Sequence, residues 1–68
     1  MKVYVVGYGE RGEGHDPHAA CLTLPAAKRY TRDTWGIRVS PAGADFWVGT
    51  ADGVDQATIT RLEIRGAS

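Results

Sequence analysis

Two segments near the N-terminus hold residue types that can carry chemistry, and the first is rich in glycine. The run from Gly7 to Gly12 has the G-x-G-x-x-G spacing that seats a dinucleotide pyrophosphate at the N-terminus of a helix. Such a site needs a helix directly after the glycines, but Gly14 and Pro17 interrupt the stretch that would form it. The chain of 68 residues is also too short for the two βαβ halves of a dinucleotide-binding fold. We therefore interpret the run as a flexible loop and expect no cofactor.

The second segment combines metal-ligand types with a nucleophile. His15, Asp16, His18 and Cys21 are side chains that zinc accepts. Their H-x2-H-x2-C spacing has no second Cys/His pair downstream to complete a structural zinc site. Catalysis by Cys21 with a histidine would also need an oxyanion hole and a substrate cleft, and a chain this short has little room for a deep pocket. We predict no metal site, no catalytic residues and no enzymatic activity.

A basic stripe is the third feature. Lys28, Arg29 and Arg32 fall within an arc of about 100° on a predicted helix. Such a stripe is most often a solvated helix face, but it can also contact phosphates or an acidic protein surface. The net charge of zero excludes a strongly basic nucleic-acid binder and a DNA mimic that acts through bulk acidity. These three residues are our candidates for binding a partner or nucleic acid.

Adjacent aromatic residues are the fourth feature. Phe46 and Trp47 are neighbours in a predicted strand, so one of the two rings faces away from the helix-covered side of the sheet. An exposed aromatic ring on a small sheet is a candidate anchor for a protein partner. We add Trp47 to the candidate partner-binding residues.

A single domain, residues 1–68, must position these side chains. Its first strand is predicted from Met1 to Tyr8, with Val3 and Val5 on one face and Tyr4, Val6 and Tyr8 on the other. A surface loop from Gly9 to His18 follows, and then a short extended segment from Ala19 to Leu22.

The predicted helix runs from Leu24 to Trp35. Thr23 is a suitable N-cap, Pro25 is tolerated in the first turn, and Gly36 is a suitable left-handed C-cap. One face should pack on the sheet; its members are Leu24, Ala27, Tyr30, Thr31 and Thr34.

Three further strands complete the prediction: residues 37–40, 45–50 and 57–65, with a turn at 41–44 and a hairpin at Asp52-Gly53. Aspartate is favoured in turns for its local hydrogen bonds, and we interpret Asp45, Asp52 and Asp55 in that way. In the last strand Ile59 is out of phase with Leu62, so either a bulge lies near Thr60 or Ile59 faces outward. The fold class is α+β: about four mainly antiparallel strands in β-α-β-β-β order, with one helix on one face.

The composition limits the cellular setting. No apolar run approaches the ~20 residues that cross a bilayer, and no signal peptide is recognisable, so we expect no membrane contact. A single cysteine, Cys21, excludes an internal disulfide and suits a reducing cytoplasm.

Several short sequence segments occur in an order that can be compared with known families. Between a V-Y-V-V strand and a last strand ending Leu62-Glu63-Ile64, the chain has Glu13-Gly14, then residues 19–24 and then Ala27-Lys28-Arg29. In this order the chain resembles the small phage-encoded anti-CRISPR proteins that inhibit type I surveillance complexes, also called Cascade. The resemblance covers most of the chain by order of elements.

The resemblance implies a stoichiometric inhibitor without catalysis. It would act in the host bacterial cytoplasm by binding Cas proteins, the backbone subunits of the crRNA-guided complex, and blocking access of target DNA. Lys28 and Arg29 match the family's A-K-R segment, from which some members contact DNA, and Arg32 matches loosely one turn on. The family's hairpin residues do not align with Phe46-Trp47, so the docking face is left open.

Two other functions fit the same residues. A small nucleic-acid-binding module would use the basic helix, and a homodimerising module would use an apolar outer sheet face or a strand edge.

Overall fold

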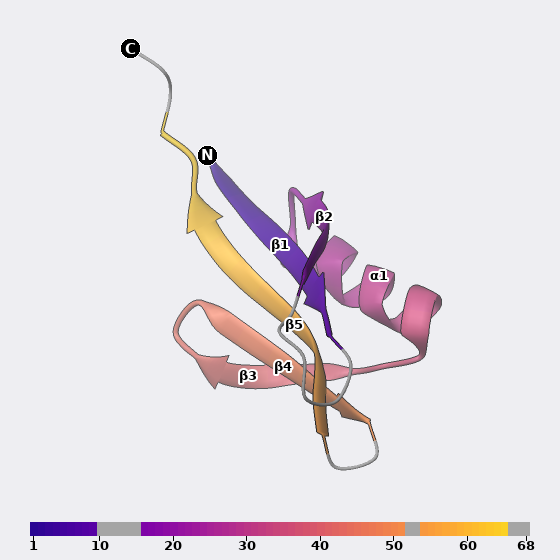
Figure 1. The fold of residues 1–68 in the computed structure, drawn as a ribbon. Helices are drawn as coiled ribbons and strands as arrows, with labels where there is room; N and C mark the ends of the chain where they lie inside the picture. The colour runs from indigo at the N-terminus through magenta and orange to yellow at the C-terminus, as the bar shows by residue number, and fades with distance from the viewer. Residues whose placement is uncertain (10–15, 52–53, 66–68) are drawn as a thin grey trace.

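The computed structural model describes residues 1–9, 16–51 and 54–65. They form a five-stranded, fully antiparallel sheet with one helix on one face (Figure 1). The predicted α+β class is confirmed, with five strands rather than four. In chain order the elements are β1 (Lys2–Tyr8), β2 (Asp16–Cys21), α1 (Leu24–Trp35), β3 (Val39–Gly43), β4 (Phe46–Ala51) and β5 (Val54–Glu63).

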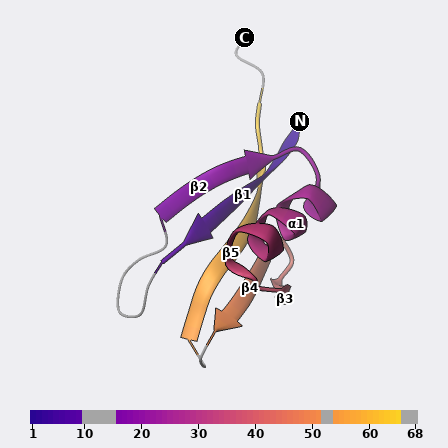
Figure 2. The same cartoon turned by 90° about the vertical axis from the view of Figure 1, so that its right-hand side faces the viewer.

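The strand order across the sheet is β2-β1-β5-β4-β3. The first and last strands are therefore central neighbours, and Lys2 of β1 lies opposite Glu63 of β5. β1 begins and β5 ends at the same end of the sheet (Figure 1). Figure 2 looks onto the face that α1 covers, where the helix contacts β1, β2 and β5.

Helix α1 has the predicted bounds because its two ends are capped locally. The Thr23 hydroxyl accepts a hydrogen bond from the Ala26 backbone N–H at 3.3 Å, and Pro25 occupies the first turn. At the other end Gly36 adopts a left-handed φ of 69°, and its N–H donates to the Arg32 carbonyl at 2.9 Å.

The core lies between α1 and the middle of the sheet. Val6, Ile59 and Trp47 come from three neighbouring strands and pack against Ala27 of the helix. Thr31 is also fully buried, and its hydroxyl donates to the Lys28 carbonyl at 2.8 Å, so this buried polar group is hydrogen-bonded.

The face of α1 that packs on the sheet differs from the prediction at one residue. Ala27 and Thr31 are buried and Leu24 and Tyr30 are half-buried, as expected. Thr34 is exposed, and Trp35 packs against the core instead. A ring at the last helical position can reach back over the sheet, which a position on an ideal helix projection does not show.

Strand β2 corrects the predicted loop from Gly9 to His18. Asp16–Cys21 pairs with β1, placing Cys21 opposite Tyr4 and Ala19 opposite Val6. His18 is an extra residue in this ladder, because the register shifts between Val6 and Gly7. The composition concealed the strand, since Pro17 is tolerated on an edge. Residues 10–15, the rest of the predicted loop, lie outside the described residues.

Neither alternative predicted for Ile59, a bulge near Thr60 or an outward-facing side chain, is correct. The register against β1 runs unbroken from Ala57 to Glu63, so no bulge lies near Thr60. Ile59 is fully buried on the helix side, and Leu62 lies on the opposite face with 49% of its surface exposed. The irregularity in β5 lies at Gln56 instead, an extra residue where the register against β4 shifts between Gly49 and Thr50.

The β3–β4 hairpin is shifted toward the C-terminus. The predicted strand at 37–40 and turn at 41–44 become β3, Val39–Gly43, and a turn at Ala44-Asp45. Ile37, just before β3, is buried beside Gly49. A Cβ at Gly49 would lie only 2.9 Å from the Arg38 carbonyl oxygen, so glycine permits this close approach. The predicted hairpin at Asp52-Gly53 lies outside the described residues, although Ala51 and Val54 pair on either side of it.

Candidate functional site

Helix α1 has two unlike flanks. The flank toward β2 is aromatic: the rings of Tyr8 and Trp35 stack at 4.4 Å, and Tyr30 meets Trp35 edge-on at 5.6 Å. The flank toward β3 is cationic. It carries Lys28 and Arg32, which are four residues apart and therefore neighbours on the helix surface.

The cationic flank faces a groove of about 280 Å³ lined by Lys28, Arg32, Arg38 and Val39. Lys28 and Arg32 are exposed on α1, as the sequence predicted. Arg29 is exposed too, but it does not line the groove, because it lies about 100° farther round the helix.

Arg38 is a candidate binding residue that was not predicted from the sequence, and it lines the same groove. Gly36 reverses the chain at the end of α1, and the Ile37 N–H donates to the Thr31 carbonyl at 3.4 Å. The chain thus turns back beside the last turn of the helix. Because Ile37 is buried, its neighbour Arg38 is exposed on the side of Arg32. The signal in the sequence was the C-cap glycine followed by an apolar and then a basic residue.

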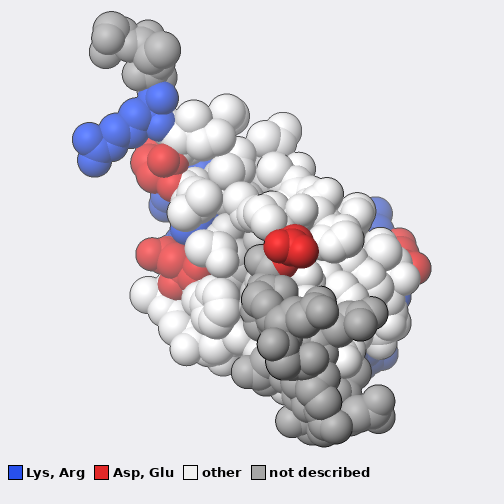
Figure 3. All heavy atoms as spheres, in the orientation of Figure 1, with Lys and Arg blue, Asp and Glu red and all other residues white. Residues whose placement is uncertain are grey.

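The charge of this flank is largely uncompensated. Arg32 Nε lies 3.9 Å from Asp33 Oδ1, and both side chains are more than half exposed, so this pair is weak. Among the side chains of residues 1–9, 16–50 and 56–65, no carboxylate lies within 4.0 Å of the charged groups of Lys28, Arg29 or Arg38. In Figure 3 blue atoms, with red atoms beside them, are visible at the right-hand margin of the surface, on the side of α1.

A second groove, of about 270 Å³, has balanced charges. Lys2, Asp45, Arg61 and Glu63 line it, and Glu63 Oε1 also lies 3.4 Å from the Met1 ammonium. Two cations face two carboxylates here. A charged ligand of either sign would therefore be repelled by one pair and attracted by the other. The groove beside β3 is therefore the better candidate for binding a charged ligand.

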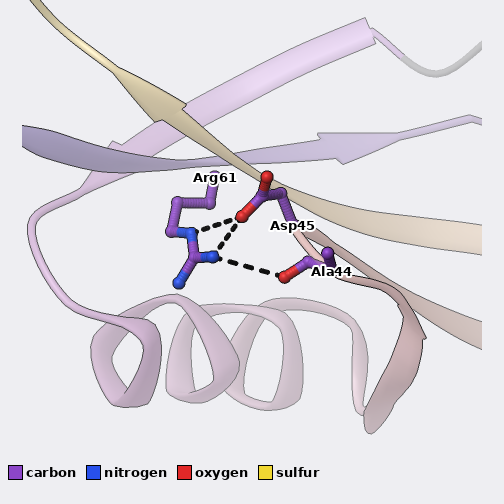
Figure 4. Close-up of polar contacts among 3 residues, drawn as sticks. All are labelled: Ala44, Asp45 and Arg61. Atoms are coloured by element: carbon purple, nitrogen blue, oxygen red, sulfur yellow. Dashed lines mark hydrogen bonds and ion pairs between the residues drawn. The ribbon is translucent and has the colours of Figure 1, made fainter.

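Arg61 has a structural part in that second groove. Its Nε donates to Asp45 Oδ1 at 2.7 Å, and its Nη2 donates to the same oxygen and to the Ala44 carbonyl (Figure 4). The hydrogen bond to Asp45, and after it the Tyr4 hydroxyl, raise the pKa of the Arg61 guanidinium above its ordinary value. These contacts hold the β3–β4 turn against β5.

The two adjacent aromatic residues exchange the expected roles. Trp47 is only 8% exposed and belongs to the core, with its ring 6.1 Å from that of Tyr4. The expectation that Trp47 would be an exposed partner contact therefore fails. Phe46, on the helix-free face, is the exposed ring at 37%.

The candidate metal ligands that the structure describes do not form a metal-binding cluster. His18 is exposed, and its ring meets Trp35 and Tyr8 edge-on at 5.3 and 6.1 Å. Within the described ranges, no three histidine, cysteine, aspartate or glutamate side chains are close enough to hold a metal ion. His15 lies outside those ranges.

No family model, curated protein or solved structure matches the chain. In the part of the chain that the structure describes, no helix is long and apolar enough to cross a membrane.

Proposed function

We propose that this protein acts by binding, without catalysis, and that its target is a type I CRISPR–Cas effector complex. The observation that carries the proposal is the exposed cationic side of α1 on a chain whose net charge is zero. The resemblance of the Ala27-Lys28-Arg29 segment to the phage-encoded anti-CRISPR proteins supplies the target. On this proposal the protein works in the bacterial cytoplasm and blocks access of target DNA to the crRNA-guided complex.

The size of the domain fits a binding role. A specific interface buries about 800 Å² on each partner. The chain exposes 4634 Å², so one such interface would take about a sixth of its surface. Lys28, Arg29 and Arg32 of α1, together with Arg38 beside the helix, would supply electrostatic steering and register for that interface.

The test compares the wild type with a charge-reversal pair, Lys28→Glu/Arg29→Glu. The matched control, Lys2→Glu/Arg65→Glu, reverses two equally exposed cations away from the helix. Wild type and control should block target-DNA binding by a purified type I effector at near-equimolar ratio, and the helix variant should not. Circular dichroism should show all three proteins folded, since exposed substitutions usually change stability by about 0.5 kcal/mol or less. Full inhibition by the helix variant would contradict the role of α1, and no inhibition by the wild type would contradict the target.

A homodimerising module is a second candidate, and one observation favours it. Phe46 and Leu62 lie on the helix-free face of the sheet and are 37% and 49% exposed, which is much apolar surface for a domain this small. Analytical ultracentrifugation of the wild type and of Leu62→Glu distinguishes the candidates. A tight dimer that Leu62→Glu dissociates, together with no effect on any effector, would favour dimerisation.

A further inference from the structure

We infer that the groove between α1 and β3 binds the phosphodiester backbone of nucleic acid, with Lys28, Arg32 and Arg38 as its phosphate contacts. The inference rests on the proposed function in that both use the cationic flank of α1. It goes further by adding a residue outside the helix and by naming the chemistry of the ligand.

The groove has the construction that such a ligand needs. Its cations come from both sides, two from α1 and Arg38 from the segment that leads into β3. The turn at Gly36 and the burial of Ile37 hold that segment against the end of the helix. Val39, half-buried, adds an apolar side chain to the lining.

The donors fit phosphate oxygens. The two guanidinium groups can each offer paired N–H donors, and the Lys28 ammonium adds a mobile point charge. Among the described residues that line the groove there is no carboxylate, and the ion pair of Arg32 with Asp33 is long and exposed. Three cations around one groove favour a ligand with several negative charges. A nucleic-acid strand is such a ligand, because it carries one negative charge at each nucleotide.

An acidic polypeptide fits this place less well. A peptide that binds beside an edge strand usually adds main-chain hydrogen bonds to its charge contacts. β3 is the edge strand here, and Pro41 in its middle has no N–H to donate. A nucleic-acid backbone needs only the cations. Because phosphate contacts position a ligand without reading its bases, we expect little sequence preference.

The test measures binding of a fluorescein-labelled single-stranded oligonucleotide to the full chain by fluorescence anisotropy over a series of salt concentrations. The groove variant Lys28→Gln/Arg38→Gln is compared with Lys2→Gln/Arg65→Gln, which removes the same charge from exposed positions elsewhere. At low salt the groove variant should bind at least about ten-fold more weakly, as expected for lost charge-assisted contacts. Its plot of log K against log salt should be shallower by about 1.4, or about 0.7 for each lost phosphate contact.

The control variant should keep the wild-type slope, and Arg38→Lys, which retains the charge, should recover most of the affinity. Equal losses in the two double variants would overturn the inference, because they would show an effect of total charge alone. Absence of wild-type binding at low salt would also overturn it. Circular dichroism of each variant checks that the fold is intact.

Further binding experiments identify which kind of nucleic acid supplies the phosphates. Duplex DNA and single-stranded RNA replace the oligonucleotide, and binding of any of the three through the groove supports the inference. Polyglutamate is added as a competitor, and displacement at lower charge concentration than unlabelled DNA would indicate an acidic polypeptide and overturn it. If the groove binds DNA but the wild type inhibits no effector, the proposed function fails and the groove stands. If the wild type inhibits an effector but binds no nucleic acid, the groove inference fails alone.

Discussion

Truncation of Ile59 should be far more costly than truncation of Leu62, three residues along the same strand. Ile59 is fully buried among Val6, Trp47 and Ala27, whereas 49% of the Leu62 surface is exposed on the other face. Ile59→Ala removes buried carbon and leaves a cavity under the helix, which costs about 2–5 kcal/mol. Leu62→Ala loses only part of its contacts and leaves no enclosed cavity, so we expect a cost of about 1 kcal/mol or less.

The small size of the domain makes this difference easy to measure. A chain of 68 residues has a free energy of unfolding of about 3–10 kcal/mol, at roughly 0.05–0.15 kcal/mol per residue. In domains of this size 1 kcal/mol shifts Tm by about 4–8 °C. Ile59→Ala should therefore lower Tm by at least about 8 °C, or unfold the protein, while Leu62→Ala should lower it by about 8 °C at most.

Thermal unfolding followed by circular dichroism, with urea unfolding as a second measure, decides between the two residues. Equal losses for the two variants, or a larger loss for Leu62→Ala, would refute the assignment of faces in β5. The unbroken register of that strand against β1 would then be wrong as well.

Three other predictions concern the cap, a close approach and an ion pair. Thr23→Ala removes the N-cap acceptor and should cost about 1 kcal/mol in urea unfolding, whereas Thr23→Ser should cost little; equal costs would contradict the cap. Gly49→Ala places a Cβ 2.9 Å from a carbonyl oxygen and should destabilise by about 1–3 kcal/mol, while Gly43→Ala meets only a 3.7 Å contact and should cost less. The raised pKa of Arg61 means that its contribution to stability is complete below its ordinary pKa and is lost only in strong alkali. The deficit of Arg61→Gln should therefore be the same in neutral and mildly alkaline buffer, and a deficit that disappears in mild alkali would contradict this.

The helix shows how far local signals reach. Thr23, Pro25 and Gly36 act on backbone groups within a few residues, so the bounds of α1 could be predicted from the sequence and are confirmed. The alternation in β1 has the same character, because the pleat places Val6 on the face opposite Val3 and Val5 whatever the neighbouring strands do. The exposed basic residues of α1 follow from the helix periodicity alone.

Tertiary pairing decided what local signals left open. The sequence predicts residues 16–18 in a loop and 19–22 in a short extended segment, whereas Asp16–Cys21 is one strand because the free edge of β1 offers it hydrogen bonds. Phe46 and Trp47 are equally apolar neighbours, so only pairing of β4 with β5 sends Trp47 into the core. Ile59 and Leu62 likewise share one strand with apolar residues on both faces, for which periodicity gives no inward side.

The candidate site likewise has a part that the sequence predicts and a part that depends on the tertiary structure. Helix periodicity placed Lys28 and Arg32 together, because their spacing of four residues is a property of any α-helix. The approach of Arg38 depended on the reversal at Gly36 and on Ile37 finding a buried place beside Gly49, a residue of another strand. The sequence by itself thus determined a capped helix with a basic face. Only the tertiary structure made that face one wall of a groove, because the opposite wall is positioned by contacts between residues distant in the chain.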